Sequence, residues 1–102
     1  MTGIPVIPGR GGLQSPSALE VRYERSFIMD LQIISSSGVR DRIRQFVFSD
    51  FFETKHLQYL PDFRPMGATQ IFYRFTLEEH LICIEVTGEI IKFVRVLPRP
   101  TL

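Results

Sequence analysis

The sequence lacks most of the features that mark a compartment or a membrane. Cys83 is the only cysteine in the 102 residues, so no intramolecular disulfide can form. A lone cysteine in an apolar run is typical of a small buried side chain in a reducing compartment. No apolar run reaches the roughly 18 to 20 residues of a membrane-spanning helix, and no basic segment precedes an apolar one at the N-terminus. We therefore expect an intracellular protein, cytoplasmic or nuclear, with no membrane association.

A strong charge of either sign is also absent. The formal net charge is +1, so no overall field draws the chain to nucleic acid or to an anionic membrane. The basic residues are nevertheless uneven, with ten arginines and two lysines. Arginine is the better residue for planar, bidentate or stacked contacts, although compositional bias explains the excess more simply.

Motifs for catalysis are missing as well. The sequence contains no GxGxxG, P-loop, HExxH or nucleophile-elbow pattern. His80 and Cys83 are three residues apart on a predicted strand, where their side chains point to opposite faces, so they cannot share a zinc ion. The carboxylates of Asp50, Glu53 and residues 78–79 fit a helix end and a turn. We expect no enzymatic activity, no metal site and no cofactor.

The clearest pattern lies between residues 70 and 97. Three runs rich in Ile, Val, Phe and Tyr are separated by short polar breaks at residues 78–79 and 87–89. β-Branched and aromatic residues suit a pleated surface, and the breaks carry turn residues. This stretch predicts an antiparallel meander of three strands.

Two further elements are predicted upstream. Residues 19–35 alternate apolar and polar side chains, which predicts a long first strand with a bend near residues 25–26. A serine cluster at residues 35–37 then supplies helix caps. The apolar residues that follow have helical spacing and predict a helix over residues 38–52: Val39, Ile43, Phe46, Val47 and Phe51.

These elements define the expected architecture. Residues 1–17 are a Pro-, Gly- and Ser-rich flexible leader, residues 18–97 form a single α+β domain, and residues 98–102 form a short tail. The β-α-β-β-β order predicts a four-stranded antiparallel sheet with one helix packed on one face. This order resembles that of cystatin- and monellin-like sheets, which wrap a helix. The resemblance is one of topology only, because the hairpin at residues 76–80 reads TLEEH instead of the inhibitory QxVxG turn.

The meander carries more apolar residues than one helix can cover. Its last two strands have apolar side chains on both faces, and the loop at residues 57–66 adds further ones. Large exposed apolar patches usually mark interaction sites. We therefore predict a non-enzymatic protein–protein interaction module that forms a homodimer or binds another protein. The alternative is that the loop covers the sheet itself. The predicted interface residues are Leu57, Tyr59, Leu60, Phe63, Met66, Phe72, Leu81 and Phe93.

A second hypothesis is a small RNA-binding or nucleoprotein accessory factor. Arginines interleaved with aromatic residues can hold single-stranded RNA through phosphate contacts and stacking. Acidic residues interspersed among these arginines favour an ordinary solvated surface instead. The candidate contacts lie on the predicted helix and strands: Arg22, Arg25, Arg40, Arg44 and Arg74.

Overall fold

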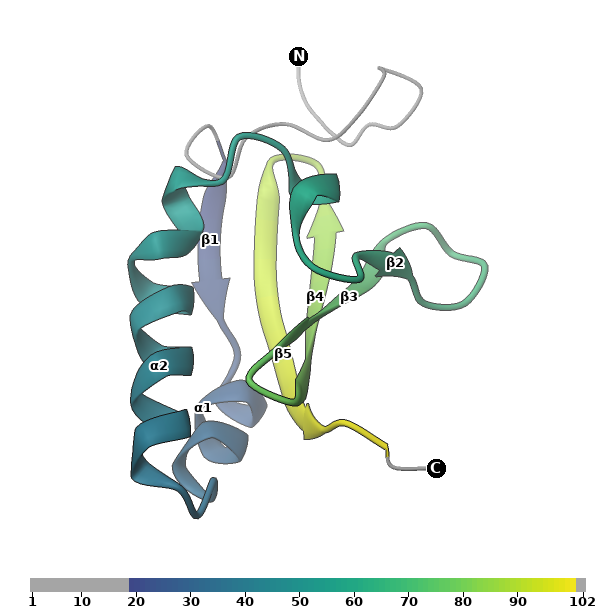
Figure 1. The fold of residues 1–102 in the computed structure, drawn as a ribbon. Helices are drawn as coiled ribbons and strands as arrows, with labels where there is room; N and C mark the ends of the chain where they lie inside the picture. The colour runs from purple at the N-terminus through teal and green to yellow at the C-terminus, as the bar shows by residue number, and fades with distance from the viewer. Residues whose placement is uncertain (1–18, 101–102) are drawn as a thin grey trace.

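The computed structural model describes residues 19–100, and the predicted leader at residues 1–17 lies outside them (Figure 1). The chain order is β1 (Glu20–Tyr23), α1 (Arg25–Gln32), α2 (Ser37–Phe48), β2 (Arg64–Pro65), β3 (Phe72–Leu77), β4 (His80–Thr87) and β5 (Ile90–Pro98). Short 3-10 turns, η2 (Asp50–Glu53) and η3 (Leu57–Tyr59), lie between α2 and β2. Within the described part of the chain, neither helix is long and apolar enough to span a membrane.

The strands form one five-stranded sheet in the order β1-β5-β4-β3-β2. β1 runs parallel to β5, and the other neighbours are antiparallel. The fold is therefore α+β as predicted, but the prediction of a four-stranded, fully antiparallel sheet with one helix was wrong. The second helix and the parallel edge strand also depart from the cystatin- and monellin-like order.

The predicted long first strand was wrong beyond its first residues. β1 ends at Tyr23, and α1 begins at Arg25. Phe27 and Leu31 are four residues apart, so one pattern satisfies both a strand face and a helix face. In the helix these two residues are buried, whereas Met29 is 53% exposed and Ile33 is 80% exposed.

The predicted helix at residues 38–52 corresponds to α2. Ser36 caps its N-terminus, with its Oγ accepting a hydrogen bond from the Val39 amide at 3.2 Å. Ile43 and Val47, one turn apart, are fully buried against the sheet. After the helix ends at Phe48, the short turn η2 buries Phe51.

The meander was predicted correctly, with strands β3, β4 and β5 joined by tight turns. Glu78 and Glu79 both have positive φ, 52° and 62°, and Gly88 has a φ of 57°. Such turns match the twist of antiparallel strands. The register between β4 and β5 shifts by one residue: Cys83 pairs with Arg95, but the next residue, Ile84, pairs with Phe93. Val94 is the extra residue of this β-bulge.

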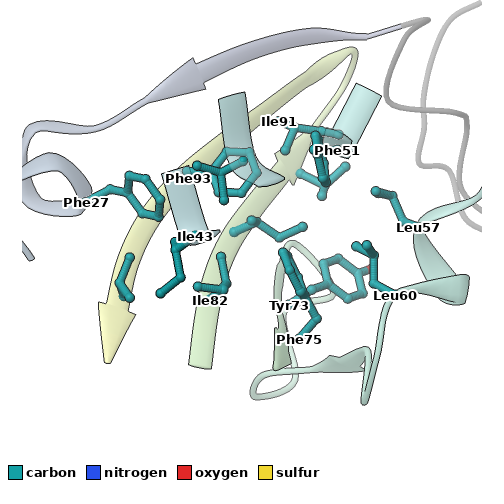
Figure 2. Close-up of a cluster of buried hydrophobic side chains, with 14 of the residues drawn as sticks. Phe27, Ile43, Phe51, Leu57, Leu60, Tyr73, Phe75, Ile82, Ile91 and Phe93 are labelled. Carbon is teal, nitrogen blue, oxygen red and sulfur yellow. The ribbon is translucent and has the colours of Figure 1, made fainter. Parts of the chain in front are cut away.

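Both helices and the loop after α2 cover a single face of the sheet. Figure 2 shows the buried cluster between them, where the rings of Phe27 and Phe51 lie 5.3 Å and 4.9 Å from the ring of Phe93. Leu57 and Leu60 belong to the same cluster. The prediction that Phe93, Leu57 and Leu60 form a partner interface therefore needs correction, because the chain buries them in its own core. Part of the apolar surplus is covered by the loop itself.

Helix α1 also covers the edge of β5 beyond the end of β1. The Ser26 hydroxyl donates a hydrogen bond to the Val94 carbonyl at 2.6 Å, and Asp30 accepts one from the Val96 amide at 2.9 Å. Side chains of α1 thus take the place of a neighbouring strand along this part of β5.

Candidate functional site on the open face of the sheet

The face of the sheet opposite the helices is the candidate site, and we call it the open face. Successive side chains of a strand point to opposite faces. Because Tyr73, Phe75, Ile82, Ile84 and Phe93 point into the core, their neighbours point to the open face. Across β3, β4 and β5 the open face consists of Phe72, Arg74, Thr76, Leu81, Cys83, Glu85, Lys92, Arg95 and Leu97.

A row of arginines crosses the open face. Arg64 pairs with Arg74, Arg74 with Cys83, and Cys83 with Arg95. We call these four residues the basic row. Neighbouring strands lie about 4.8 Å apart, so the row places three guanidinium groups across four strands with a small cysteine between them.

A second row runs beside the basic row, where Arg22, Lys92, Glu85 and Phe72 pair in turn across β1, β5, β4 and β3. Arg22 forms an exposed ion pair with Glu20 at 2.6 Å. The two rows together hold five basic residues and one acidic residue, so the open face is basic although the whole chain is close to neutral.

The arginines of the basic row differ in what they already bind. Arg95 donates two hydrogen bonds to Asp30, at 2.6 Å from Nε and 3.1 Å from Nη2. Within residues 19–100, Arg64 and Arg74 form no ion pair. Arg64 and Arg74 therefore keep their hydrogen-bond donors for a ligand.

The ion pair changes the pKa of both of its groups. Burial alone would raise the pKa of Asp30, but the hydrogen bonds from Arg95 and from the Val96 amide, together with the charge of Arg95, outweigh it and lower that pKa. Hydrogen bonding and the charge of Asp30 raise the pKa of Arg95 in turn. Asp30 thereby fixes Arg95 from the edge of the sheet.

Cys83 sits in the middle of the basic row but is unsuited to nucleophilic chemistry. Its side chain is only 7% exposed. Burial raises the pKa of the thiol, and the nearby charges of Arg95 and Arg74 offset this effect only in part. A raised pKa keeps the thiol protonated, and the thiolate is the reactive form.

Apolar side chains lie beside the basic row. Phe72 is 36% exposed, and Met66 is 37% exposed next to it, where the Met66 amide donates to the Phe72 carbonyl. Leu81 and Leu97 are paired and half-buried further along the same face. An exposed aromatic ring beside guanidinium groups can pack against a protein side chain or stack on a base.

The predicted interface residues thus separate into groups. Phe72, Leu81 and Met66 lie on or beside the open face, whereas Tyr59 is 69% exposed on η3. Phe63 stacks on Tyr73, with ring centroids 5.1 Å apart and planes at 8°. These five residues stay proposals for partner contact, while the others are core.

The arginines predicted to contact RNA are not gathered in one place. Arg74 and Arg22 lie on the open face, but Arg25, Arg40 and Arg44 belong to the helices on the other side of the sheet. Arg40 donates to the Ile34 carbonyl at 2.7 Å, which ties it to the connection between the helices.

Sequence reasoning missed Arg64, Lys92 and Arg95 as members of the open face. Strand alternation could have placed Lys92 opposite Phe93, but the bulge at Val94 shifts Arg95, and β2 has only two residues. Among residues 19–100 no cluster of His, Cys, Asp or Glu could hold a metal ion.

Comparisons with known proteins give a match in fold. No family model matches the chain, and no curated protein matches its sequence. The chain is similar to a chain of the toxin-antitoxin complex RelBE2 from Mycobacterium tuberculosis, with a TM-score of 0.60 and 14% identity, over 80% of this chain and 99% of that one. It is also similar to a chain of the RelB-RelE antitoxin-toxin complex from Methanococcus jannaschii, with a TM-score of 0.60 and 26% identity, over 76% and 88% of the two chains. Both of these chains come from structures of protein–protein complexes.

Proposed function

We propose that this chain is one subunit of a two-protein assembly of the RelB–RelE kind and that it binds its partner protein through the open face. The single observation that carries the proposal is the likeness to the chain from Methanococcus jannaschii, which is 26% identical and spans 88% of that chain. The open face supports it, because an exposed aromatic side chain beside guanidinium groups is the composition of an interface centre.

Phe72 and Arg74 are the proposed contacts. Phe72 is the exposed aromatic residue of the face, and Arg74 is its near neighbour with no ion pair within residues 19–100. Arginine recognises carboxylates with two parallel hydrogen bonds. The partner segment is therefore acidic and apolar. A homodimer through the same face stays a prediction.

Co-purification from the source cells tests this proposal, with a tagged wild-type chain compared with its Phe72→Asp variant. The wild type is expected to retain one stoichiometric protein, and Phe72→Asp is expected to lose it. Met29→Asp is the matched control, since Met29 is 53% exposed on the helix side of the sheet. Retention of the same protein by Phe72→Asp would contradict the open face as the binding surface. Sedimentation of the purified chain alone tests the homodimer.

A second candidate function is RNA binding at the same face, and the unpaired state of Arg64 and Arg74 within residues 19–100 favours it. Guanidinium groups bind phosphates, and Phe72 can stack on a base. Titration of labelled single-stranded RNA at several salt concentrations tests it, because phosphate contacts make affinity fall with salt. Replacing both arginines by Glu should reduce the salt slope by about one for each lost contact.

Arg44→Glu is the control for the RNA experiment. Arg44 is exposed on α2, away from the open face, so this variant should leave the slope unchanged. A slope near zero for the wild type would remove the RNA hypothesis. The same samples, run on a denaturing gel, test the prediction that the chain has no enzymatic activity: shortened RNA would overturn it.

A further inference from the structure

A cavity of about 290 Å³ lies where the connection between α1 and α2 meets the ends of β4 and β5. Asp30 in its lining also binds Arg95 of the basic row. Its apolar wall consists of Ile33, Ile34, Val39, Val96 and Pro98. A cavity of this size can enclose one large side chain, and a mostly apolar wall with a few polar groups is typical of binding sites.

The polar lining of the cavity consists of Asp30, His80 and two serines, Ser35 and Ser36, whose hydroxyls can donate or accept. The Asp30 Oδ2 atom already accepts from Arg95 and from the Val96 amide, but within residues 19–100 Oδ1 accepts only one bond, at 3.1 Å from Arg95. A carboxylate oxygen has two lone pairs, so Oδ1 has room for another donor.

His80 also lines the cavity and can offer a second hydrogen-bond acceptor. Its Nδ1 lies 2.7 Å from the Glu78 carbonyl oxygen, which can only accept, so Nδ1 carries the hydrogen. When the ring carries this one hydrogen, the Nε2 atom is an acceptor. Among the described residues that line the cavity there is no lysine or arginine. Asp30 is thus the one acidic side chain among them, and because its charge is already paired with Arg95, its free lone pair on Oδ1 is what the cavity offers to a donor.

Ile33 marks the entrance of the cavity. It is 80% exposed, more than any other large apolar side chain among residues 19–100, and it follows the last residue of α1. An isoleucine exposed at the rim of an apolar cavity can be buried by an incoming side chain, which is how interface anchors gain most of their affinity.

We propose that this cavity is a second docking site, which receives one aliphatic or aromatic side chain of a partner-protein segment together with an adjacent lysine or arginine. The acceptors of Asp30 and His80 select the basic residue, and the apolar wall selects the anchor. The site rests on the proposed function only in that its occupant is a protein segment.

Selection from a display library of random twelve-residue peptides tests the site. Binding to the wild type is selected in the presence of excess soluble Ile33→Arg variant, which removes peptides that bind elsewhere, including the open face. The enriched peptides should carry a lysine or arginine within about one helical turn of a large apolar residue. Enrichment of acidic peptides, or no enrichment, would overturn the proposal.

The most enriched peptide is then synthesised, and its dissociation constant is measured by fluorescence polarisation. Ile33→Arg should weaken binding at least about tenfold, because it removes apolar wall and adds a like charge. Met29→Arg adds the same charge one turn earlier on α1 without touching the lining, and should change binding less than about twofold. Equal losses in both variants would overturn the proposal, as would unchanged binding when the peptide's basic residue is replaced by Glu.

The same measurement separates this site from the proposed function. Phe72→Asp lies on the open face and should leave peptide binding unchanged, although it is expected to lose the co-purified partner. If the peptide result fails while Phe72→Asp still loses the partner, only the cavity proposal falls. If Phe72→Asp retains the partner while the peptide result holds, only the open-face proposal falls.

Discussion

The two faces of this sheet use the same strand alternation for opposite purposes. The helix-covered face buries Phe75, Ile82, Ile84 and Phe93 completely, and among the described residues no polar or charged side chain is fully buried with them. The open face carries charged and half-exposed side chains on the alternate positions of the same strands. The helix-covered face therefore provides the stability, and the side chains of the open face can vary without loss of the core. Four substitutions or measurements test how far this division holds.

The largest expected effect comes from Phe93→Asp on the helix-covered face. The ring of Phe93 contacts the rings of Phe27, Phe51 and Tyr23, so the change leaves a cavity and a buried carboxylate. Loss of a buried phenylalanine ring alone costs about 3–5 kcal/mol, and the charge adds to this cost. We expect an unfolded chain by circular dichroism. A cooperative thermal transition near that of the wild type would contradict the placement of Phe93 in the core.

A smaller effect is expected from Asp30→Asn, which acts where the two faces meet. Asp30 lies on α1 but accepts hydrogen bonds from Arg95 of the open face and from the Val96 amide. Hydrogen bonds to charged groups contribute about 1.5–3 kcal/mol each when buried; because Arg95 is half-exposed, we expect a total loss of about 1–2 kcal/mol. Urea unfolding at neutral pH measures this loss.

The pH dependence of that loss has a defined sign. The pKa of Asp30 is lower in the folded protein than in the unfolded chain, chiefly because the bonds from Arg95 and Val96 outweigh burial. Its contribution to stability is therefore present above the unfolded pKa of about 3.9 and disappears as the pH falls through the folded pKa. The difference between wild type and Asp30→Asn should be constant above about pH 5 and should shrink below about pH 4. A constant difference down to pH 2 would show that the charge of Asp30 is not involved.

Phe72→Asp is the matched partner of Phe93→Asp, with the same change on the other face of the sheet. Because Phe72 is 36% exposed and points away from the helices, we expect less than about 1 kcal/mol of destabilisation. Urea unfolding of both variants in parallel measures the contrast. A loss as large as that of Phe93→Asp would mean that the open face is part of the core.

The smallest structural effect is expected from labelling Cys83, the most buried side chain of the basic row. Its thiol is 7% exposed, and burial raises its pKa. At pH 8 an aromatic disulfide reagent should therefore react with the native protein at least about tenfold more slowly than with the urea-unfolded chain. Equal rates in the native and unfolded protein would show that Cys83 on β4 is accessible to the reagent from the open face.

The parts of the fold that were predicted correctly depend on neighbours in sequence. Tight turns at residues 78–79 and at Gly88 separate strands that pair with one another, so the local pattern contained the whole meander. The helix α2 likewise carries its own cap at Ser36 and its own apolar stripe.

The parts that were missed depend on pairings between distant segments. β1 pairs with β5 about 70 residues later, as Tyr23 with Phe93, and no local signal shows a parallel partner. The Phe27–Leu31 spacing fits a strand as well as a helix. The hydrogen bonds from Ser26 and to Asp30 that favour the helix form with β5, so they exist only in the folded protein. The sequence predicted an interaction surface on the second face of the sheet, but only the strand register shows that its arginines form the basic row.

The cover that α1 places on β5 has a consequence for self-assembly into fibrils. Exposed strand edges are the templates on which chains add to one another. Here the Val94 carbonyl and the Val96 amide are occupied by Ser26 and Asp30, so growth from that edge first requires α1 to detach. Protonation of Asp30 loosens this cover, and because the pKa of Asp30 is lowered in the folded protein, it requires acid below about pH 4. Strong acid is thus the condition under which this edge would be most prone to polymerise.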